Sequence, residues 1–595
     1  MGGLPVPPRD GVRSAASQHA AAAVGIWAVV KRDEAAAPSW DPQSRILFAG
    51  DVRLYNRREL IAALQVRQPE GRADLELARL AYMRWGEQSP KHLVGDFAFA
   101  AWHEESRRLF AARDHLGAKS LFYRRLRDGI VVASDVRQIL ALVDRPFDEV
   151  DADALFDWFS RIRDQRRTFF RGIDSLLPGH LLTADSRESR QVRYWMPPTE
   201  VHRASYEENC EEIRTLFENA VRGRLESDHP IVAHSSGGFD SSTMLMAADR
   251  IYRREPGRPP LIMASATAPG YPSDESRYMD AVAAAVSFEG RRWNVVEELE
   301  PVFPGVTGSR PLLRRGLAGG PRRDYEIVRE RGARVLLTGY IGDDVWYARG
   351  VLRDLARHGR WWRVVSNIIQ RGVDPSTPGR LFDAALGVFP PGLAQRLAER
   401  VFSGLPPPPG WMGPALLEIQ RSIGHPAARQ IPGVEWQSHV VHGVWAQLTD
   451  PVVAMVLESA NEEGLEEGIE VRTPFTDVRL IEHMLMIPWQ QRDPRGHHRR
   501  TGRDALGALL PPEFATRIGQ QSWADVWAVT SRRTAKTLAP FIVEGPWLSA
   551  PFVDRGVARA MLARVLTQTM EVPPEMSPLV VDFAALEAWL RQLLR

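Results

Sequence analysis

The sequence predicts an α/β chain of two domains: an α+β domain over residues 1–200 and a parallel-sheet domain with a helical C-terminal region over residues 201–595. Three observations predict this arrangement. The 595 residues are too many for one hydrophobic core. Short apolar runs separated by turns fill the first part, whereas such runs alternate with helical patterns in the second. A double proline at residues 197–198 precedes a helical pattern where this rhythm changes.

The first domain is expected to be rich in strands. Apolar runs bounded by turn residues predict strands within residues 20–30, 45–55, 95–114 and 128–135. Apolar residues at helical spacing predict helices within residues 57–64 and 73–86. The run at residues 20–30 is too short to cross a bilayer, so we interpret it as a buried strand and expect no membrane span.

The second domain begins with a regular alternation of strands and helices. The runs "PIVAHS", "PLIMASA" and "ARVLLT" are short and mostly apolar, and each is followed by a loop and a helical pattern. This order is typical of a parallel sheet covered by helices on both faces. The proline-rich stretch at residues 402–414 predicts a stiff connection inside the helical C-terminal region.

Charge and cysteine content narrow the classes of partner and compartment. The formal net charge is +2, which argues against a nucleic-acid partner bound by massed phosphate neutralisation. The single cysteine, Cys210, shares a helical stripe with apolar residues and is expected to be a packed core thiol. Because one cysteine cannot form a disulfide within the chain, the composition suits a reducing cytoplasm.

The stretch "HSSGGFDSS" at residues 234–242 places a glycine turn between a strand and a helix. Such a turn leaves backbone N–H groups pointing into one concavity at the helix N-terminus, which suits a phosphate. Asp240 would repel a bare phosphate, so a divalent cation is expected between them. The alternative is an ordinary helix cap. The phosphate ligands expected from this loop are Ser235, Ser236, Gly237, Gly238, Ser241 and Ser242.

A second acidic turn follows another buried strand. "LLTGYIGDD" ends in Asp343 and Asp344. Because the carboxyl ends of parallel strands meet at one edge of a sheet, Asp240 and Asp343 are expected to share magnesium, with Asp344 as a further candidate ligand. The alternative is that these aspartates are surface turn residues.

The loop lacks the Gly-Lys-Ser/Thr ending of a Walker motif and resembles the signature of ATP pyrophosphatases. Together with "GDFAFAAWHEESRRLFAARDHLGAKSLFY", "LLTGYIGDD" and "GIEVRTPFTDVRLIEHM", it makes the chain similar to asparagine synthetase-like amidotransferases. The resemblance implies a glutaminase-like αββα sandwich followed by a doubly wound ATP-pyrophosphatase domain that uses ATP and Mg²⁺. Adenine is then expected beside His234, Ser265 and Thr338, and Gly339 is a further candidate for binding the nucleotide.

Three positions depart from the family pattern. Val24 stands where a working glutaminase has its nucleophilic cysteine, and an isopropyl group cannot attack an amide. Tyr340 replaces the glutamate of asparagine synthetases, as in relatives that close rings with an internal amine, where it could take or relay a proton. Arg517 lies near the place of a family lysine and is the candidate to pair with phosphate.

Among relatives without the cysteine, the lasso peptide cyclases fit best. The chain carries Trp-, Arg- and Ile-rich segments such as "RHGRWWRVVSNIIQRG", which suit a groove for an apolar peptide and equally suit helix packing. The resemblance implies a precursor core peptide as substrate and a leader peptidase and leader-binding protein as partners. The alternatives are a β-lactam synthetase-like enzyme and an inactive binding scaffold. The basic cluster at residues 492–503 is expected to be solvated surface.

Overall fold

The computed structural model describes most of the 595 residues. The residues outside this description are 1–10, 17–19, 27–32, 34–35, 69, 128, 160–165, 299–319, 347, 349, 371–376, 392, 395–396, 398–411, 417–435, 437, 493–498, 516, 518–524, 527, 530–531, 534–535, 537–546, 568–582, 584–585, 588, 592 and 594–595.

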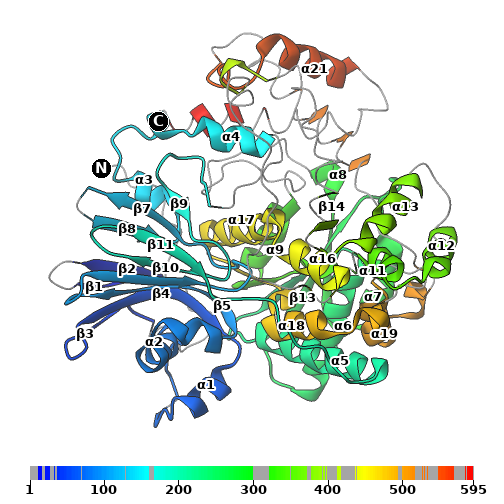
Figure 1. The fold of residues 1–595 in the computed structure, drawn as a ribbon, viewed down its shortest axis with the longest axis horizontal. Coiled ribbons are helices and arrows are strands. Elements are labelled where there is room, and N and C mark those ends of the chain that lie inside the picture. Colours follow the sequence, from blue (N-terminus) through cyan, green and yellow to red (C-terminus); the bar gives the residue numbers. More distant parts are fainter. Residues whose placement is uncertain are drawn as a thin grey trace.

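The N-terminal domain is a four-layer sandwich of antiparallel sheets, which confirms the predicted α+β fold (Figure 1). A cluster including Leu109, Tyr123 and Leu182 is buried between the two main sheets, and α2 and α3 pack against β4 and β8 on the outer faces. One sheet has six strands: β11 (Ser189–Arg193), β10 (His180–Ala184), β6 (Arg108–Arg113), β5 (Gly95–His103), β4 (Ile46–Leu54) and β3 (Ser39–Asp41). The other has β8 (Gly129–Ala133), β7 (Phe122–Leu126) and β9 (Asp174–Ser175). The helices are α1 (Arg57–Ala63), α2 (Asp74–Trp85), α3 (Val136–Leu140) and α4 (Ala152–Phe159).

A separate two-stranded sheet contains Val24. Strands β1 (Gly11–Ala16) and β2 (Ala21–Ile26) pair antiparallel, with Val24 opposite Arg13. Val24 therefore lies inside a paired strand, where its nitrogen is a peptide amide. A nucleophile that relies on a free terminal amine needs a chain start at this position, and the hairpin has none.

The second domain is built on a parallel sheet, as predicted. Its strand order is β14-β13-β12-β15-β16, and every neighbouring pair is parallel. The chain runs outward from β12 to β14 and then returns to β15 on the other side of β12. Such a reversal opens a crevice at the carboxyl ends of the two central strands, where ligands bind in this class of fold. The strands are β12 (Ile231–His234), β13 (Leu261–Thr267), β14 (Glu289–Asn294), β15 (Val335–Leu337) and β16 (Glu470–Arg472).

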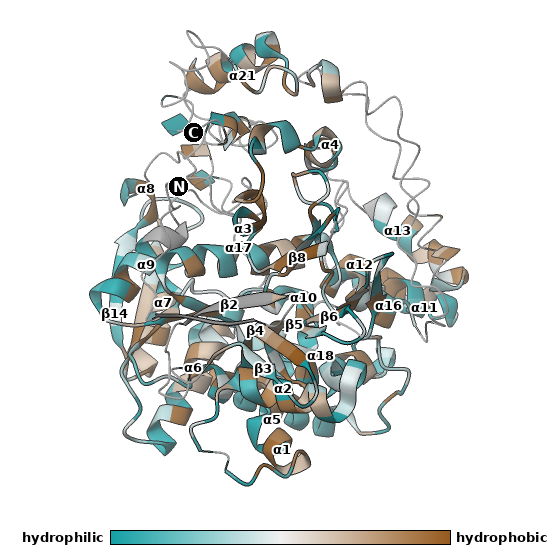
Figure 2. Ribbon diagram, turned by 90° about the vertical axis from the view of Figure 1, so that its left-hand side faces the viewer, coloured by the Kyte–Doolittle hydropathy of each residue, from teal (hydrophilic) through white to brown (hydrophobic). Residues whose placement is uncertain are grey.

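Alternating strand residues face two different cores. Ile231 and Ala233 join one buried cluster and Val232 joins another, because successive side chains of a strand point to opposite faces. The first face packs on α5 and α6 and the second on α9 (Figure 1), and hydrophobic and hydrophilic residues alternate along these helices (Figure 2). The helices here are α5 (Tyr206–Arg224), α6 (Phe239–Arg254), α7 (Ser276–Ala285), α8 (Val295–Glu298) and α9 (Gly320–Glu330).

The C-terminal region is helical, as predicted. One stretch, residues 439–467, is long and apolar enough for a membrane span by length and composition. The 18-residue window that meets this test is 56% buried in the protein, and the stretch is divided by the cap at Asp450. The last described segment of the C-terminal region returns to the N-terminal domain, where the ring centroids of Trp589 and Phe170 lie 5.5 Å apart. The helices are α10 (Gly342–Trp346), α11 (Val351–Arg357), α12 (Trp361–Gln370), α13 (Thr377–Ala385), α16 (His439–Leu448), α17 (Pro451–Glu467), α18 (Val478–Met486), α19 (Arg500–Leu506) and α21 (Arg555–Thr567).

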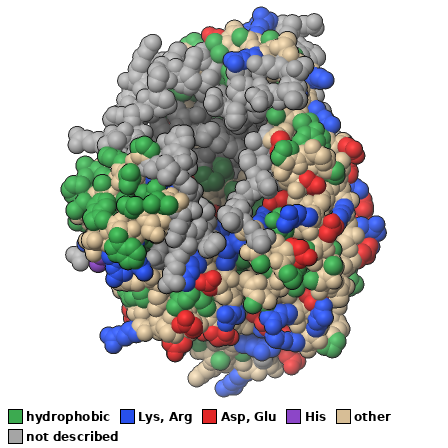
Figure 3. All heavy atoms as spheres, turned by 90° about the vertical axis from the view of Figure 1, so that its right-hand side faces the viewer, with side chains coloured by type: hydrophobic (Ala, Val, Ile, Leu, Met, Phe, Trp, Pro, Cys, Tyr) green, Lys and Arg blue, Asp and Glu red, His purple; other side chains and the backbone are tan. Residues whose placement is uncertain are grey.

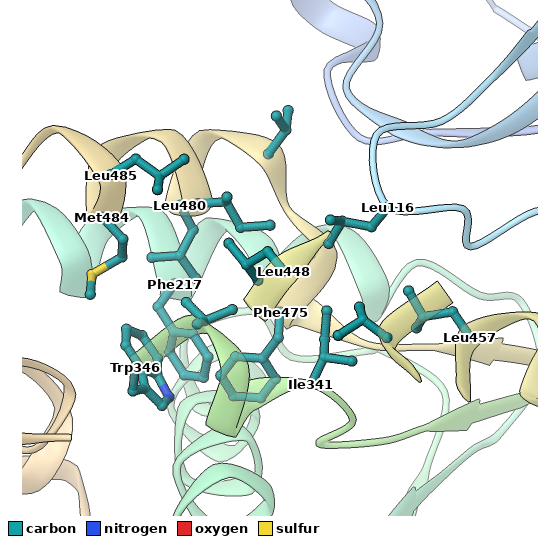
Figure 4. Packing of buried hydrophobic residues seen from close by; sticks show 14 of the residues in the cluster. Leu116, Phe217, Ile341, Trp346, Leu448, Leu457, Phe475, Leu480, Met484 and Leu485 are labelled. Atoms are coloured by element: carbon teal, nitrogen blue, oxygen red, sulfur yellow. The ribbon is translucent and has the colours of Figure 1, made fainter. Parts of the chain in front are cut away.

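The two domains share one hydrophobic core. Leu116 of the N-terminal domain belongs to the same buried cluster as Leu457 and Phe475 (Figure 4). Buried ion pairs add to this contact. The Arg53 guanidinium of β4 donates to both carboxylate oxygens of Glu470 in β16, at 3.2 and 3.0 Å. Contacts with the N-terminal domain therefore help to stabilise the second domain. Cys210 is buried in the same cluster, as predicted for a packed thiol.

Candidate functional site

The loop after β12 is held in a tight turn by its own side chains. The hydroxyls of Ser236 and Ser241 lie 3.0 Å apart, and the Gly238 amide donates to the Ser236 hydroxyl at 3.3 Å. Gly237 has φ of +71°, and a Cβ there would lie 3.0 Å from Glu275. Only glycine adopts this conformation readily at such a close approach. The loop serines thus shape the turn as well as lining it.

The loop opens onto the N-terminus of α6 at Gly238. Among the described residues no side chain caps this helix, so the alternative of an ordinary side-chain cap is not what the loop forms. An uncapped N-terminus presents backbone N–H groups and the positive end of the helix dipole to an anion. Asp240 lies in the first turn of α6.

The carboxylates of Asp240 and Asp343 both pair with the guanidinium of Arg499. The Arg499 guanidinium pairs with Asp240 Oδ2 at 3.1 Å and with Asp343 Oδ1. The Trp346 indole donates to Asp240 Oδ1 at 2.9 Å. Burial, and next the negative charge of Asp343, raise the pKa of Asp240, while Arg499 lowers it. Two carboxylates that converge on a single positive charge fit a divalent cation, so these residues would hold Mg²⁺.

Asp344 has a different partner. Its carboxylate accepts a hydrogen bond of 2.6 Å from the Gln447 amide of α16. The described residues contain no group of three or more His, Cys, Asp or Glu side chains arranged to hold a metal. A metal at Asp240 and Asp343 therefore needs further oxygen ligands, which triphosphate and water supply in many magnesium sites.

The turn between β15 and α10 is strained and crowded. Ile341 has φ of +58°, a left-handed conformation that costs a β-branched residue about 1–3 kcal/mol. A Cβ added at Gly342 would lie 2.5 Å from Asp240 Cγ, and one at Gly339 would lie 3.0 Å from the Ser241 nitrogen. The two glycines let this turn touch the first turn of α6. Such contact sets the spacing of the two aspartates.

Three buried serine hydroxyls lie in the loop after β12, in α6 and in β13. Ser235, Ser242 and Ser265 each have a buried hydroxyl for which the described residues offer no hydrogen-bond partner. Buried polar atoms in this state are uncommon and are satisfied by a ligand or water in most proteins. The Thr338 hydroxyl donates instead to the Arg472 carbonyl at 3.3 Å, which leaves it a structural role between β15 and β16.

Tyr340 lies among acidic groups. Burial, followed by the negative charges of Glu463 and Asp324, raises the pKa of its phenol. Tyr340 therefore stays protonated at neutral pH and is poorly suited to act as the initial base. Asp324 also accepts hydrogen bonds from His234 Nδ1 at 2.6 Å and from the Trp293 indole at 3.3 Å. Burial lowers the pKa of His234, but Asp324 outweighs this effect and raises it overall.

Arg517 contacts the backbone of the glycine loop that follows β12. Its guanidinium donates to the Gly237 carbonyl and pairs with Glu275, and it stacks 4.3 Å from the Tyr278 ring centroid. These contacts place Arg517 beside the glycine loop that follows β12. Its role as a phosphate ligand stays a prediction, because both described partners are protein groups.

The residue that sequence reasoning missed is Arg499. The basic cluster at residues 492–503 was expected to be solvated surface, which is wrong for Arg492 and Arg499, because Arg492 is 1% exposed and Arg499 joins the two aspartates. His497 and His498 lie outside the described residues. An arginine-rich run carries no local signal that distinguishes the one member facing a site 259 residues away.

Comparison with known proteins identifies the family. Residues 212–591 match the family described as asparagine synthase, and residues 11–195 match a glutamine amidotransferase domain. Glutamine-hydrolyzing asparagine synthetase 3 of Bacillus subtilis (strain 168) is 26% identical over 504 residues, which cover 79% of this chain and 74% of that protein. Amidase chyE of Penicillium rubens is 34% identical over 207 residues, which cover 33% of this chain and 29% of that protein. The asparagine synthase match spans more than half of the sequence, and this chain belongs to the asparagine synthase family.

Proposed function

We propose that this chain is an ATP-dependent lasso peptide cyclase. In this proposal it adenylates an Asp or Glu side-chain carboxylate of a core peptide and joins it to the N-terminal amine of the same peptide. The products are a macrolactam, AMP and pyrophosphate. The chain works in the cytoplasm with a leader peptidase and a leader-binding protein, which release and present the core peptide.

One contrast carries the proposal. The nucleotide half keeps its glycine loop and its paired Asp240 and Asp343. The glutaminase half has Val24 inside the β1–β2 hairpin, where glutamine-dependent relatives need a cysteine. A valine cannot release ammonia from glutamine, so the amine must belong to a substrate. A ring-closing amide synthetase needs the nucleotide-binding residues and does not need the glutaminase nucleophile.

The reaction balances in two steps. A carboxylate oxygen of the core peptide attacks the α-phosphorus of ATP, and the bond from that phosphorus to the oxygen bridging it to the β-phosphate breaks, so that pyrophosphate leaves. The peptide's α-amine then attacks the acyl carbon, loses a proton and expels AMP. Asp240 and Asp343 would hold Mg²⁺, which neutralises pyrophosphate charge. The α6 N-terminus binds phosphate oxygens, and a pocket that holds the folded peptide supplies proximity.

Tyr340 acts in this proposal as a neutral hydrogen-bonding group. Its raised pKa keeps the proton on the phenol, so it can relay a proton from the attacking amine toward Glu463 only by giving up its own. The two carboxylates that raise its pKa, Glu463 and Asp324, also attract an ammonium group electrostatically. This environment favours an amine substrate near Tyr340.

An exposed apolar surface supports a peptide substrate. On α12 Trp362 and Ile369 are 69% and 62% exposed, and Val388, which follows α13, is 66% exposed. Hydrophobic side chains gather on this face of the molecule (Figure 3). Surfaces of this kind mark sites of interaction with peptides or proteins.

Peptide-dependent pyrophosphate release tests the proposal. Purified chain is mixed with ATP, Mg²⁺ and leader-free core peptides encoded beside its gene, with and without glutamine. Release that needs the peptide and not glutamine supports the cyclase. Release only with a small β-amino acid derivative contradicts it in favour of a β-lactam synthetase-like enzyme, and no release with any candidate leaves a binding scaffold.

An Asp240→Asn variant checks the same site, with Asp280→Asn as the matched loss of one acidic side chain. Asp280 lies on α7, and its side chain is 61% exposed in an ion pair with Arg292. Pyrophosphate release at the wild-type rate from Asp240→Asn would show that the paired carboxylates have no part in the reaction.

A further inference from the structure

The Arg499 side chain occupies the position between the two carboxylates that fit a metal ion. It is 14% exposed, and it reaches Asp240 and Asp343 with separate nitrogens of one guanidinium. The other oxygen of Asp240 is taken by the Trp346 indole. In this state both described contacts of the Asp240 carboxylate are with protein donors. A divalent cation and a guanidinium repel each other and seek the same oxygens, so the two cannot share this place.

Other positive groups lie close to the same spot. Arg503, one turn along α19, lies over the Phe239 ring at 5.4 Å. Burial, and then the positive charges of Arg499 and Arg517, lower the pKa of Arg503. Positive charge gathered at an open helix N-terminus attracts an anion with several charges.

We propose that Arg499 is an exchangeable counter-ion and pyrophosphate ligand. Without nucleotide it neutralises Asp240 and Asp343; when Mg²⁺ arrives with a triphosphate, Arg499 leaves the carboxylates and pairs with the β- and γ-phosphates. This rests on the proposed function only in that the site binds Mg²⁺ with a triphosphate. The geometry permits the exchange, because a planar guanidinium that bridges two carboxylates matches two phosphate oxygens equally well.

The exchange has a consequence that needs no peptide. Mg²⁺ alone cannot displace Arg499 without a phosphate to receive it, so the wild-type chain should show no change of Tm with Mg²⁺ alone. In Arg499→Gln the two carboxylates face each other without the guanidinium that pairs with both. This variant should have a lower Tm without metal, and Mg²⁺ alone should raise it.

The test combines thermal unfolding with calorimetric binding of pyrophosphate in the presence of Mg²⁺. Loss of a charge-assisted contact predicts pyrophosphate binding about 10- to 100-fold weaker in Arg499→Gln. Arg500→Gln is the matched control, because the Arg500 guanidinium pairs with Asp504 and lies over the Tyr206 ring. It should behave as the wild type in both measurements.

Arg499→Lys keeps the experiment decisive if the glutamine variant does not fold. A lysine carries the charge but cannot bridge both carboxylates with one planar group. We expect a partial Tm response to Mg²⁺ and intermediate pyrophosphate affinity. The proposal is overturned if Mg²⁺ alone raises the Tm of the wild type as much as that of the variants, or if the variants bind pyrophosphate as the wild type does. Because no peptide is used, this failure is distinct from failure to cyclise a peptide.

Discussion

Gly342→Ala tests whether the contact between the two acidic turns sets the geometry of the site. A Cβ at Gly342 would lie 2.5 Å from Asp240 Cγ, whereas carbon atoms pack at about 3.5–4.0 Å. Asp240 or the α10 turn must therefore move by about 1 Å. A misplacement of that size in a reacting site costs about 100-fold in rate, so we expect pyrophosphate release to fall by about that factor.

The assay for Gly342→Ala is steady-state pyrophosphate release at saturating ATP and peptide, with circular dichroism to confirm folding. Gly379→Ala in α13 is the matched control, because a Cβ there meets no atom within 4 Å. A Gly342→Ala chain that folds and turns over at the wild-type rate would refute the reasoning that this glycine holds the aspartates in register.

Three further substitutions test the roles of Tyr340, His115 and Glu470. Tyr340→Phe should slow ring closure more than peptide-dependent exchange between pyrophosphate and ATP, and equal losses in the two assays would contradict a role in the second step. His115 is buried and has a pKa lowered by burial to about 4, against about 6.5 unfolded. The free energy of unfolding therefore keeps the full contribution of neutral His115 above pH 6.5 and loses about 3 kcal/mol of it as the pH falls toward 4. In His115→Phe the free energy of unfolding should depend less on pH over this range. An unchanged dependence would contradict the assignment. Glu470→Gln leaves Arg53 and Arg472 with less counter-charge and should lower the free energy of unfolding by about 3–5 kcal/mol in urea titrations, with a fall below 1 kcal/mol as the contrary result.

Much of the nucleotide half can be predicted from sequence because its signals are local. The runs containing Ile231, Leu261 and Val335 alternate with helical patterns, and this order predicts a parallel sheet. Once the sheet is parallel, the turns after two of its strands must meet at one edge. The approach of Asp240 to Asp343 therefore follows from topology.

The remaining features depend on contacts between distant segments. Arg499 reaches the aspartates from a basic run that looks like solvated surface, and nothing local marks it. Arg517 is turned toward Glu275 and the Gly237 carbonyl by packing that its neighbours in sequence do not reveal. Trp589 packs on the N-terminal domain although it lies near the other end of the chain. Such contacts are decided by tertiary packing and carry no periodic pattern.

The pKa of Tyr340 shows how the structure refines a chemical prediction. From the sequence, the resemblance to ring-closing synthetases predicts that Tyr340 acts as a base or as a proton relay. Burial beside Glu463 and Asp324 raises its pKa and excludes the phenolate as the resting form at neutral pH. A protonated Tyr340 can act as a relay only by passing on its own phenolic proton while it receives one from the amine.

Mass spectrometry of a core peptide incubated with this chain, ATP and Mg²⁺ in the absence of glutamine tests directly whether the chain closes a macrolactam. We expect a product lighter than the peptide by one water, formed together with AMP and pyrophosphate and resistant to labelling at its N-terminal amine. A peptide whose N-terminus stays free, or a product formed only when glutamine or ammonia is added, would contradict it.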